Sequence, residues 1–137
     1  MKSLLAIIAS LALSITAFAA TKGAEPAHIS HGQTVNLADY LVPGKTTVFD
    51  FTSKHCGPCQ TYNEPLAQLH TQRDDIAVVK VDINRPEVKK IDWQSPVALQ
   101  YNMNGLPHFK VYGPDGKLIV EGRKGRSFVD KLIAELK

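Results

Sequence analysis

Residues 46–59 read TTVFDFTSKHCGPC, a β-branched and aromatic run that leads into a Cys-Gly-Pro-Cys tetrad. Residues 46–52 have the composition of a buried strand. Pro58 suits the first turn of a helix, where the N–H group that proline lacks would have no partner. We therefore expect the tetrad to lie where a strand passes into a helix. The helix dipole stabilises a thiolate at that place and lowers the pKa of the thiol.

Cys56 and Cys59 are the two cysteines of the 137-residue chain. Their i, i+3 spacing puts both sulfurs on one face of the helix, within bonding reach. A bridge that closes so short a loop removes little entropy from the unfolded chain, so it makes a poor structural staple. We interpret Cys56 as the nucleophile that attacks a substrate disulfide, and Cys59 as the thiol that resolves the mixed disulfide. We expect this cycle to require no organic cofactor and no metal.

The rest of the chain alternates between strand and helix patterns. Apolar residues on alternate positions indicate a strand at 76–83, and Gly-Pro-Asp-Gly at 113–116 indicates a hairpin. Two strands joined through a helix should run parallel, and the hairpin adds an antiparallel edge, so the pattern predicts an α/β fold with a mixed sheet. The other elements that we expect are a helical turn at 36–41, a helix at 58–72, helical pieces at 86–102, hairpin strands at 107–112 and 117–121, and a final helix from Ser127 with Asp130 in a capping-box relation.

The N-terminal residues have the three parts of an export signal. Lys2 precedes an apolar run at 4–13, and Ala17-Phe18-Ala19 has the small-x-small pattern that a signal peptidase recognises. We expect residues 1–19 to be a cleaved signal peptide and the protein to be periplasmic.

The predicted signal divides the chain into three parts. Residues 20–33 are small and polar and should be a flexible lead-in, and residues 34–137 should form the folded domain. The alternative to cleavage is an N-terminal membrane anchor with the domain facing the periplasm. The apolar stretch at 4–20 is at the short end for a spanning helix, which favours cleavage.

Composition excludes several function classes. Apolar residues make up 44% and charged residues 21% of the chain, as in ordinary soluble domains, and the length suits one domain. The formal net charge of +3 is small, and a glycine breaks the densest basic stretch, residues 123–126. We therefore expect no nucleic-acid partner. We also expect a monomer.

The tetrad and its surroundings resemble the thioredoxin family, whose active site has the Cys-Gly-Pro-Cys form. Residues 48–51 resemble the family's central strand, with the aspartate six positions before Cys56. Residues 80–82 resemble the next core strand, and Gly-Leu-Pro at 105–107 resembles the segment with the family's cis-proline. The resemblance covers residues 34–137. It implies a three-layer sandwich, with a mixed central sheet flanked by helices, and thiol–disulfide oxidoreductase activity.

The resemblance also implies roles for residues outside the tetrad. Asp50 would lie beneath the cysteines and exchange a proton with Cys59, with Lys80 nearby. From the residues alone, a carboxylate in an apolar strand should be protonated or paired, because its burial costs several kcal/mol. Pro107 would be cis beside the sulfurs, and the Leu106 backbone would pair with an extended substrate segment.

His55 stands where thioredoxins usually have tryptophan. A protonated imidazole there would favour the Cys56 thiolate and shift its pKa. The alternative is an exposed loop histidine with no role in the chemistry. With Gly57 and Pro58, His55 makes up the active-site loop, and its presence leaves substrate preference and reduction potential open.

Two other classes of function compete with an oxidoreductase. Cys56, Cys59 and His55 are residue types that bind zinc, but the other histidines show no second paired set of ligands, so we expect no metal. A thioredoxin-like fold can also serve as a binding module, although the presence of both cysteines disfavours this.

The direction of the redox chemistry has two interpretations. The gaps at 60–75 and 83–106 are too short for the large helical insertion of periplasmic disulfide oxidases, which together with the Gly-Pro dipeptide favours a protein-disulfide reductase. Its substrates would be exported proteins with a disulfide, and a membrane thiol-transfer partner would supply its electrons. The alternative is a disulfide donor of the same fold.

Overall fold

The computed structural model describes residues 19–136, and within this range five strands form one mixed sheet in the order β1-β3-β2-β4-β5. The expected signal peptide and its anchor alternative lie, apart from Ala19 and Ala20, outside the described residues. Across residues 19–136, no helix is long and apolar enough to cross a membrane. The strands are β1 (Ala27–Ile29), β2 (Thr46–Thr52), β3 (Ile76–Asp82), β4 (His108–Tyr112) and β5 (Leu118–Glu121).

β2 is the central strand, and its pairing confirms the expected mixed sheet. It runs parallel to β3, with Asp50 opposite Lys80, because helices connect the two strands. It runs antiparallel to β4, with Phe51 opposite His108, and β5 returns antiparallel to β4 through the hairpin. Pro107, which immediately precedes His108, therefore lies at the same end of the sheet as the tetrad.

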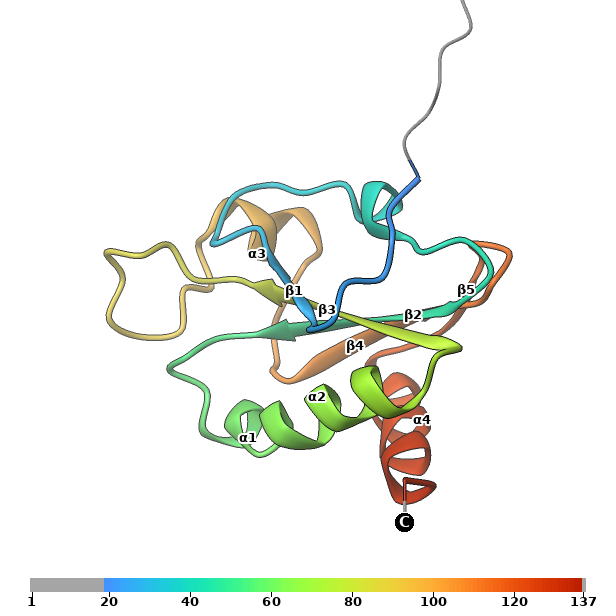
Figure 1. Ribbon diagram of the computed structural model, residues 1–137. Coiled ribbons are helices and arrows are strands. Elements are labelled where there is room, and N and C mark those ends of the chain that lie inside the picture. Colours follow the sequence, from blue (N-terminus) through green and yellow to red (C-terminus); the bar gives the residue numbers. More distant parts are fainter. Residues whose placement is uncertain (1–18, 137) are drawn as a thin grey trace, which may run out of the picture.

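Helices cover both faces of the sheet, which confirms the three-layer sandwich. In Figure 1, α1, α2 and α4 lie on one face, and η1 and α3 lie on the other. Residues 47–52 of β2 are all buried as a result. The helices are η1 (Leu37–Tyr40), α1 (Gly57–Gln60), α2 (Asn63–Gln72), α3 (Pro96–Gln100) and α4 (Gly122–Ala134).

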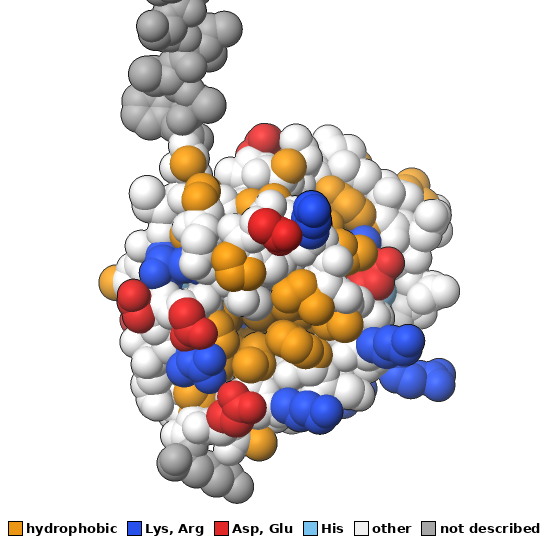
Figure 2. Space-filling view, turned by 90° about the vertical axis from the view of Figure 1, so that its right-hand side faces the viewer, with side chains coloured by type: hydrophobic (Ala, Val, Ile, Leu, Met, Phe, Trp, Pro, Cys, Tyr) orange, Lys and Arg blue, Asp and Glu red, His pale blue; other side chains and the backbone are white. Residues whose placement is uncertain are grey.

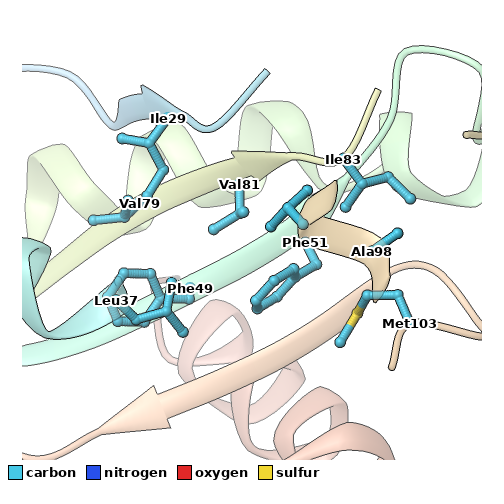
Figure 3. Packing of buried hydrophobic residues seen from close by; sticks show 10 residues of the cluster. Ile29, Leu37, Phe49, Phe51, Val79, Val81, Ile83, Ala98 and Met103 are labelled. Atoms are coloured by element: carbon cyan, nitrogen blue, oxygen red, sulfur yellow. The ribbon is translucent and has the colours of Figure 1, made fainter. Parts of the chain in front are cut away.

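Two clusters of buried apolar side chains form the core, one on each face of β2, because successive side chains of a strand point to opposite faces. Phe49 and Phe51 belong to the cluster on the side of α3 and η1, where Figure 3 shows them close to apolar side chains of β3. Val48 belongs to the other cluster, with residues of α2 and α4. The alternation puts Asp50 on the same face as Val48, beneath α1 and α2.

The end of the sheet away from the tetrad carries β5 and the hairpin, on the side that Figure 2 turns toward the viewer. Apolar side chains gather in the middle of this face. Leu118 and Ile119 of the edge strand β5 are 45% and 48% exposed. Leu118 pairs with Tyr112, which pairs with Thr47 at the start of β2, so Leu118 lies at the opposite end of the sheet from the cysteines.

The expected helix at 58–72 is divided into α1 and α2. Proline lacks the N–H group that a helix interior requires, so Pro65 fits only the first turn of a new helix. The N–H of Tyr62 turns back to Cys59 O at 3.1 Å, and the N–H of Leu66 then donates to Tyr62 O at 2.9 Å. The helix therefore restarts at Asn63, beside the sheet.

The final helix starts earlier than Ser127, and the expected capping box is wrong. α4 begins at Gly122, whose φ of 63° lets the chain leave β5 sharply. The Ser127 hydroxyl donates to Arg123 O within the helix, at 3.3 Å. Asp130 instead accepts a hydrogen bond from the Tyr62 hydroxyl at 2.7 Å, so tertiary packing decides its role.

Two segments differ from their expected local structure. The lead-in at 20–33 contains β1, which pairs in parallel with β3 and satisfies the backbone of that strand's outer edge. Within residues 86–102, α3 is the single helix, with Pro96 in its first turn as expected. Pro86 lies in a turn closed by the Val88 N–H and Arg85 O at 3.1 Å.

We predict that Gly125→Ala destabilises the protein. At an exposed position inside a helix, alanine is more favourable than glycine by about 1 kcal/mol. A Cβ at this buried position of α4 would lie 2.5 Å from the Phe109 carbonyl oxygen of β4, and the helix would have to move off the sheet. We expect a net loss of about 1–3 kcal/mol in the free energy of unfolding, measured by denaturant titration. Ser127→Ala, at an exposed position of the same helix, is the control, and an equal or greater loss there would contradict this interpretation.

Candidate active site

The tetrad follows the end of β2 and forms the cap and the first residues of α1. Cys56 is the residue that caps α1, and its sulfur accepts the Cys59 N–H at 3.2 Å. Pro58 lies in the first turn, as the sequence predicts. Cys56 is 3% exposed and Cys59 is fully buried, whereas Gly57 and Pro58 between them are exposed. A partner would therefore reach the pair from the side of Cys56.

The two sulfurs are joined in a disulfide, with an S–S distance of 2.09 Å and a Cα–Cα distance of 5.3 Å. The prediction that the i, i+3 spacing brings them within bonding reach is confirmed. The structure thus shows the oxidised form of the pair. The separate roles of nucleophile for Cys56 and resolving thiol for Cys59 stay predictions.

Asp50 is a buried acid to which the described residues donate no hydrogen bond. Its side chain is completely buried, and neither carboxylate oxygen finds a donor within the described residues. Lys80 is also buried. Its Nζ lies 3.8 Å from Asp50 Oδ2 and donates a hydrogen bond to Asn63 Oδ1 at the start of α2. Burial raises the pKa of Asp50 to about 7, and the positive charge of Lys80 partly offsets this rise. Near neutral pH, this carboxyl group can both accept and release a proton.

The segment before β4 has the expected cis peptide bond. The Leu106–Pro107 peptide bond is cis, and both residues are partly exposed. The register of β4 against β2 brings this segment to the end of the sheet where the tetrad lies. Leu106 and Pro107 therefore lie at the same end of the sheet as the tetrad, and their role in substrate binding stays a prediction.

His55 is held by the protein. Its backbone N–H donates to Ser53 Oγ at 3.1 Å, and its ring Nε2 lies 3.2 Å from the Val88 carbonyl oxygen, to which it donates in the Nε2–H tautomer. The half-buried ring therefore bridges the active-site loop and the loop that follows β3. Its effect on the Cys56 thiolate stays a prediction.

The described residues give no support to a metal site. From residue 19 to residue 136, no group of three or more His, Cys, Asp or Glu side chains is placed to hold a metal ion. The other histidines are spread over the domain. They are His28 in β1, His31 in the following turn, His70 in α2 and His108 in β4.

Comparison with known proteins identifies the family. The family model described as Thioredoxin matches residues 32–137, most of the chain. The chain belongs to the thioredoxin family. An H-type thioredoxin of Fagopyrum esculentum is 31% identical over 83 residues, which are 59% of this chain and 65% of the relative. A thioredoxin of Arabidopsis thaliana is 33% identical over 63 residues, 46% of this chain and 37% of the relative. The matches thus span less than two thirds of these curated relatives.

Solved structures of thioredoxins share the fold. Thioredoxin f of spinach chloroplasts superposes with a TM-score of 0.54 at 17% identity, over 83% of this chain and 88% of that chain. A mutant thioredoxin of Halobacterium salinarum NRC-1 superposes with a TM-score of 0.52 at 19% identity, over 85% of this chain and 96% of that chain. At these identities the likeness concerns the fold alone.

Sequence reasoning missed a buried polar group next to the active site of this thioredoxin-family protein. Asn84, 3% exposed, accepts the Ser53 hydroxyl at 2.6 Å and so joins the loop after β3 to the loop before Cys56. Asn63 was missed as the partner of Lys80. Small polar residues at strand and helix ends are common in any chain, so nothing in the sequence distinguishes these two.

We predict that Asp50→Asn changes how stability depends on pH. The folded protein holds the Asp50 proton up to about pH 7, whereas the unfolded chain releases it near 3.8. Wild-type stability should therefore fall as pH rises through this window, by on the order of 4 kcal/mol. The variant lacks this fall, so the difference in unfolding free energy, variant minus wild type, should rise between pH 4 and 8 in denaturant titrations. Any constant cost of burying the amide leaves this slope unchanged.

The control for this prediction is Asp74→Asn, at a fully exposed side chain. It reports the general effect of removing one carboxylate. If the free energy of unfolding of the two variants depends on pH in the same way, the pH dependence does not come from the buried Asp50 and the prediction is wrong.

Proposed function

We propose that this protein is an exported protein-disulfide reductase that acts through Cys56 and Cys59. The observation that carries the proposal is the Cys56–Cys59 disulfide at the start of α1, with the buried Asp50 on the strand that leads to it. Membership of the thioredoxin family supports thiol–disulfide oxidoreductase chemistry for this arrangement.

The proposed reaction has two exchange steps. The Cys56 thiolate attacks one sulfur of the substrate disulfide, the substrate S–S bond breaks, and the leaving thiolate takes a proton from solvent. Cys59 then loses its proton and attacks the Cys56 sulfur, the mixed disulfide bond breaks, and the Cys56–Cys59 disulfide forms. The second substrate sulfur leaves as a thiolate and takes a proton from solvent. Two electrons pass from the protein to the substrate, and the structure corresponds to the resulting oxidised form.

Asp50 is the proposed acceptor of the Cys59 proton. A general base is most effective when its pKa lies near the working pH, and burial raises the pKa of Asp50 to about 7. Lys80 limits this rise through its charge. The Leu106 backbone, beside the cis-proline, would pair with the extended segment that carries the substrate disulfide.

The proposed protein works in the periplasm and receives its electrons from a partner in the membrane. The N-terminal pattern of residues 1–19 supports export to the periplasm, where cytosolic reductants are absent, so a membrane thiol-transfer partner would have to reduce Cys56–Cys59 after each cycle.

The protein recovered from the periplasm should begin at Ala20 by mass spectrometry. A protein that retains Met1 would instead support the membrane anchor.

We predict that the two cysteines differ in effect when replaced. Cys56→Ser should lower the rate at which the reduced protein cleaves a peptide disulfide by about a thousandfold, because the attacking thiolate is lost. Cys59→Ser should still attack and should accumulate the mixed disulfide at Cys56, visible by intact mass. An unchanged rate in Cys56→Ser, or a trapped adduct in that variant alone, would contradict the assigned roles.

The reduction potential of the Cys56–Cys59 pair decides whether the protein reduces disulfides or donates them. Equilibration of Cys56–Cys59 in glutathione buffers should give a value of about −270 mV, the range of a reductant. A value of about −120 mV would instead mark a disulfide donor, the second candidate, with His55 as the residue to replace first.

A further inference from the structure

A hollow beside the active-site loop is lined by the chain's single tryptophan and by two lysines. Its lining residues are His55, Lys89, Lys90, Ile91 and Trp93. Since His55 is joined to Cys56, the hollow opens next to the tetrad. Figure 1 shows the segment after β3 at the same end of the sheet as α1. No step of the proposed reaction uses this hollow.

Asn84 fixes the segment that forms the hollow. Between β3 and α3, residues 83–95 contain neither helix nor strand. The Asn84 amide donates to Val88 O at 3.2 Å and Lys90 O at 2.7 Å. Its oxygen accepts the Ser53 hydroxyl at 2.6 Å and the Asp92 N–H at 3.2 Å. This buried amide therefore has every donor and acceptor satisfied, and it holds both sides of the loop against the active-site loop.

Two further contacts hold the loop. Arg85 and Asp92 form a two-pronged ion pair, at 2.7 Å and 3.0 Å, which joins the beginning of the loop to its end. The His55 ring reaches Val88 O at 3.2 Å. The lysines that follow Val88 are thus attached to a backbone that is organised before any partner arrives.

The loop has a surplus of positive charge at the hollow. Lys89 and Lys90 are exposed, and none of the ion pairs among residues 19–136 includes either. Asp92 is neutralised by Arg85, which leaves Glu87 as the remaining acid of the loop. Each lysine therefore has charge and donors available for a partner.

We propose that this hollow docks an acidic segment next to the disulfide of the substrate protein. Carboxylates of the segment would pair with Lys89 and Lys90, and the half-buried Ile91 and Trp93 would contact its apolar atoms. The docked segment would place the neighbouring disulfide at Cys56. This inference rests on the proposed reductase function and specifies the chemistry of its substrate.

Binding without chemistry is the first test, with Trp93 as the reporter. The oxidised protein is titrated with three cysteine-free peptides of matched sequence that carry glutamate, glutamine or lysine at the same positions. The glutamate peptide should change the tryptophan fluorescence and bind about tenfold tighter than the lysine peptide at low salt. This preference should shrink as salt is added. Equal titrations for all three peptides would overturn the proposal.

A matched pair of variants locates the attraction. Lys89→Gln with Lys90→Gln should abolish the preference for glutamate. Lys117→Gln with Lys131→Gln removes the same charge from the hairpin and from the last turn of α4 and should preserve the preference. Both pairs lie at exposed positions, and thermal unfolding checks that they fold. An equal loss in both would show that total charge and not the hollow attracts the peptide, which overturns the proposal.

Kinetics separate this inference from the function on which it rests. The same peptides, each with one cysteine joined to 2-thiopyridine, are mixed with the reduced protein, and release of 2-thiopyridone is followed. Docking is supported if the glutamate peptide reacts about tenfold faster than the lysine peptide. This difference in rate should disappear in the Lys89 and Lys90 variant alone. Equal rates for all peptides overturn the docking site and leave the reductase function standing. If none of the peptide disulfides is cleaved, both proposals fall.

Discussion

The structure depends on its central strand, β2. This strand is buried on both faces and hydrogen-bonded on both edges. β3 and β4 pair with it, and the two apolar clusters meet across it. A strand held in this way cannot shift its register without exposing one set of side chains, because neighbouring residues point to opposite faces. Its end is therefore a fixed point, and the chain places Cys56 there, at the cap of α1. The reactive pair gains its position from the best-packed element of the domain.

Asp50 is a position of this strand at which burial opposes stability. An acid without hydrogen-bond donors in the described residues, beside one lysine at 3.8 Å, favours the protonated form, and its pKa rises to about 7. An apolar residue, such as Val48 two positions earlier on this face, would be the more stable choice. We propose that the buried Asp50 lowers the stability of the fold and in return provides a group that can take a proton from the cysteines. Asn63 contributes by binding Lys80, which leaves the carboxylate without a direct hydrogen bond from that lysine.

The loop after β3 is held in place by side-chain contacts. Here the loop is organised by polar side chains in place of regular structure. Asn84 supplies the hydrogen bonds that a helix would otherwise supply to the carbonyl groups of Val88 and Lys90. Helical pieces were expected at 86–102 because Pro86 suits a first turn, and that local preference was overridden by these contacts.

The sequence by itself determined the strand that carries Asp50, the strand-to-helix position of Cys56 and the mixed α/β sheet, because these follow from residues adjacent in the chain: composition, period and the i, i+3 spacing. The residues also indicated that the acid at position 50 must be neutral or paired, whereas the cis bond before Pro107 was implied by the resemblance to the thioredoxin family and not by the residues themselves. Only the tertiary structure decided that β1 pairs with β3, that α4 begins at Gly122, and that Ser53 and Asn84 join two loops. Each of these depends on partners far apart in the sequence, and a single residue's propensity, worth less than 1 kcal/mol, cannot specify which distant group it will meet.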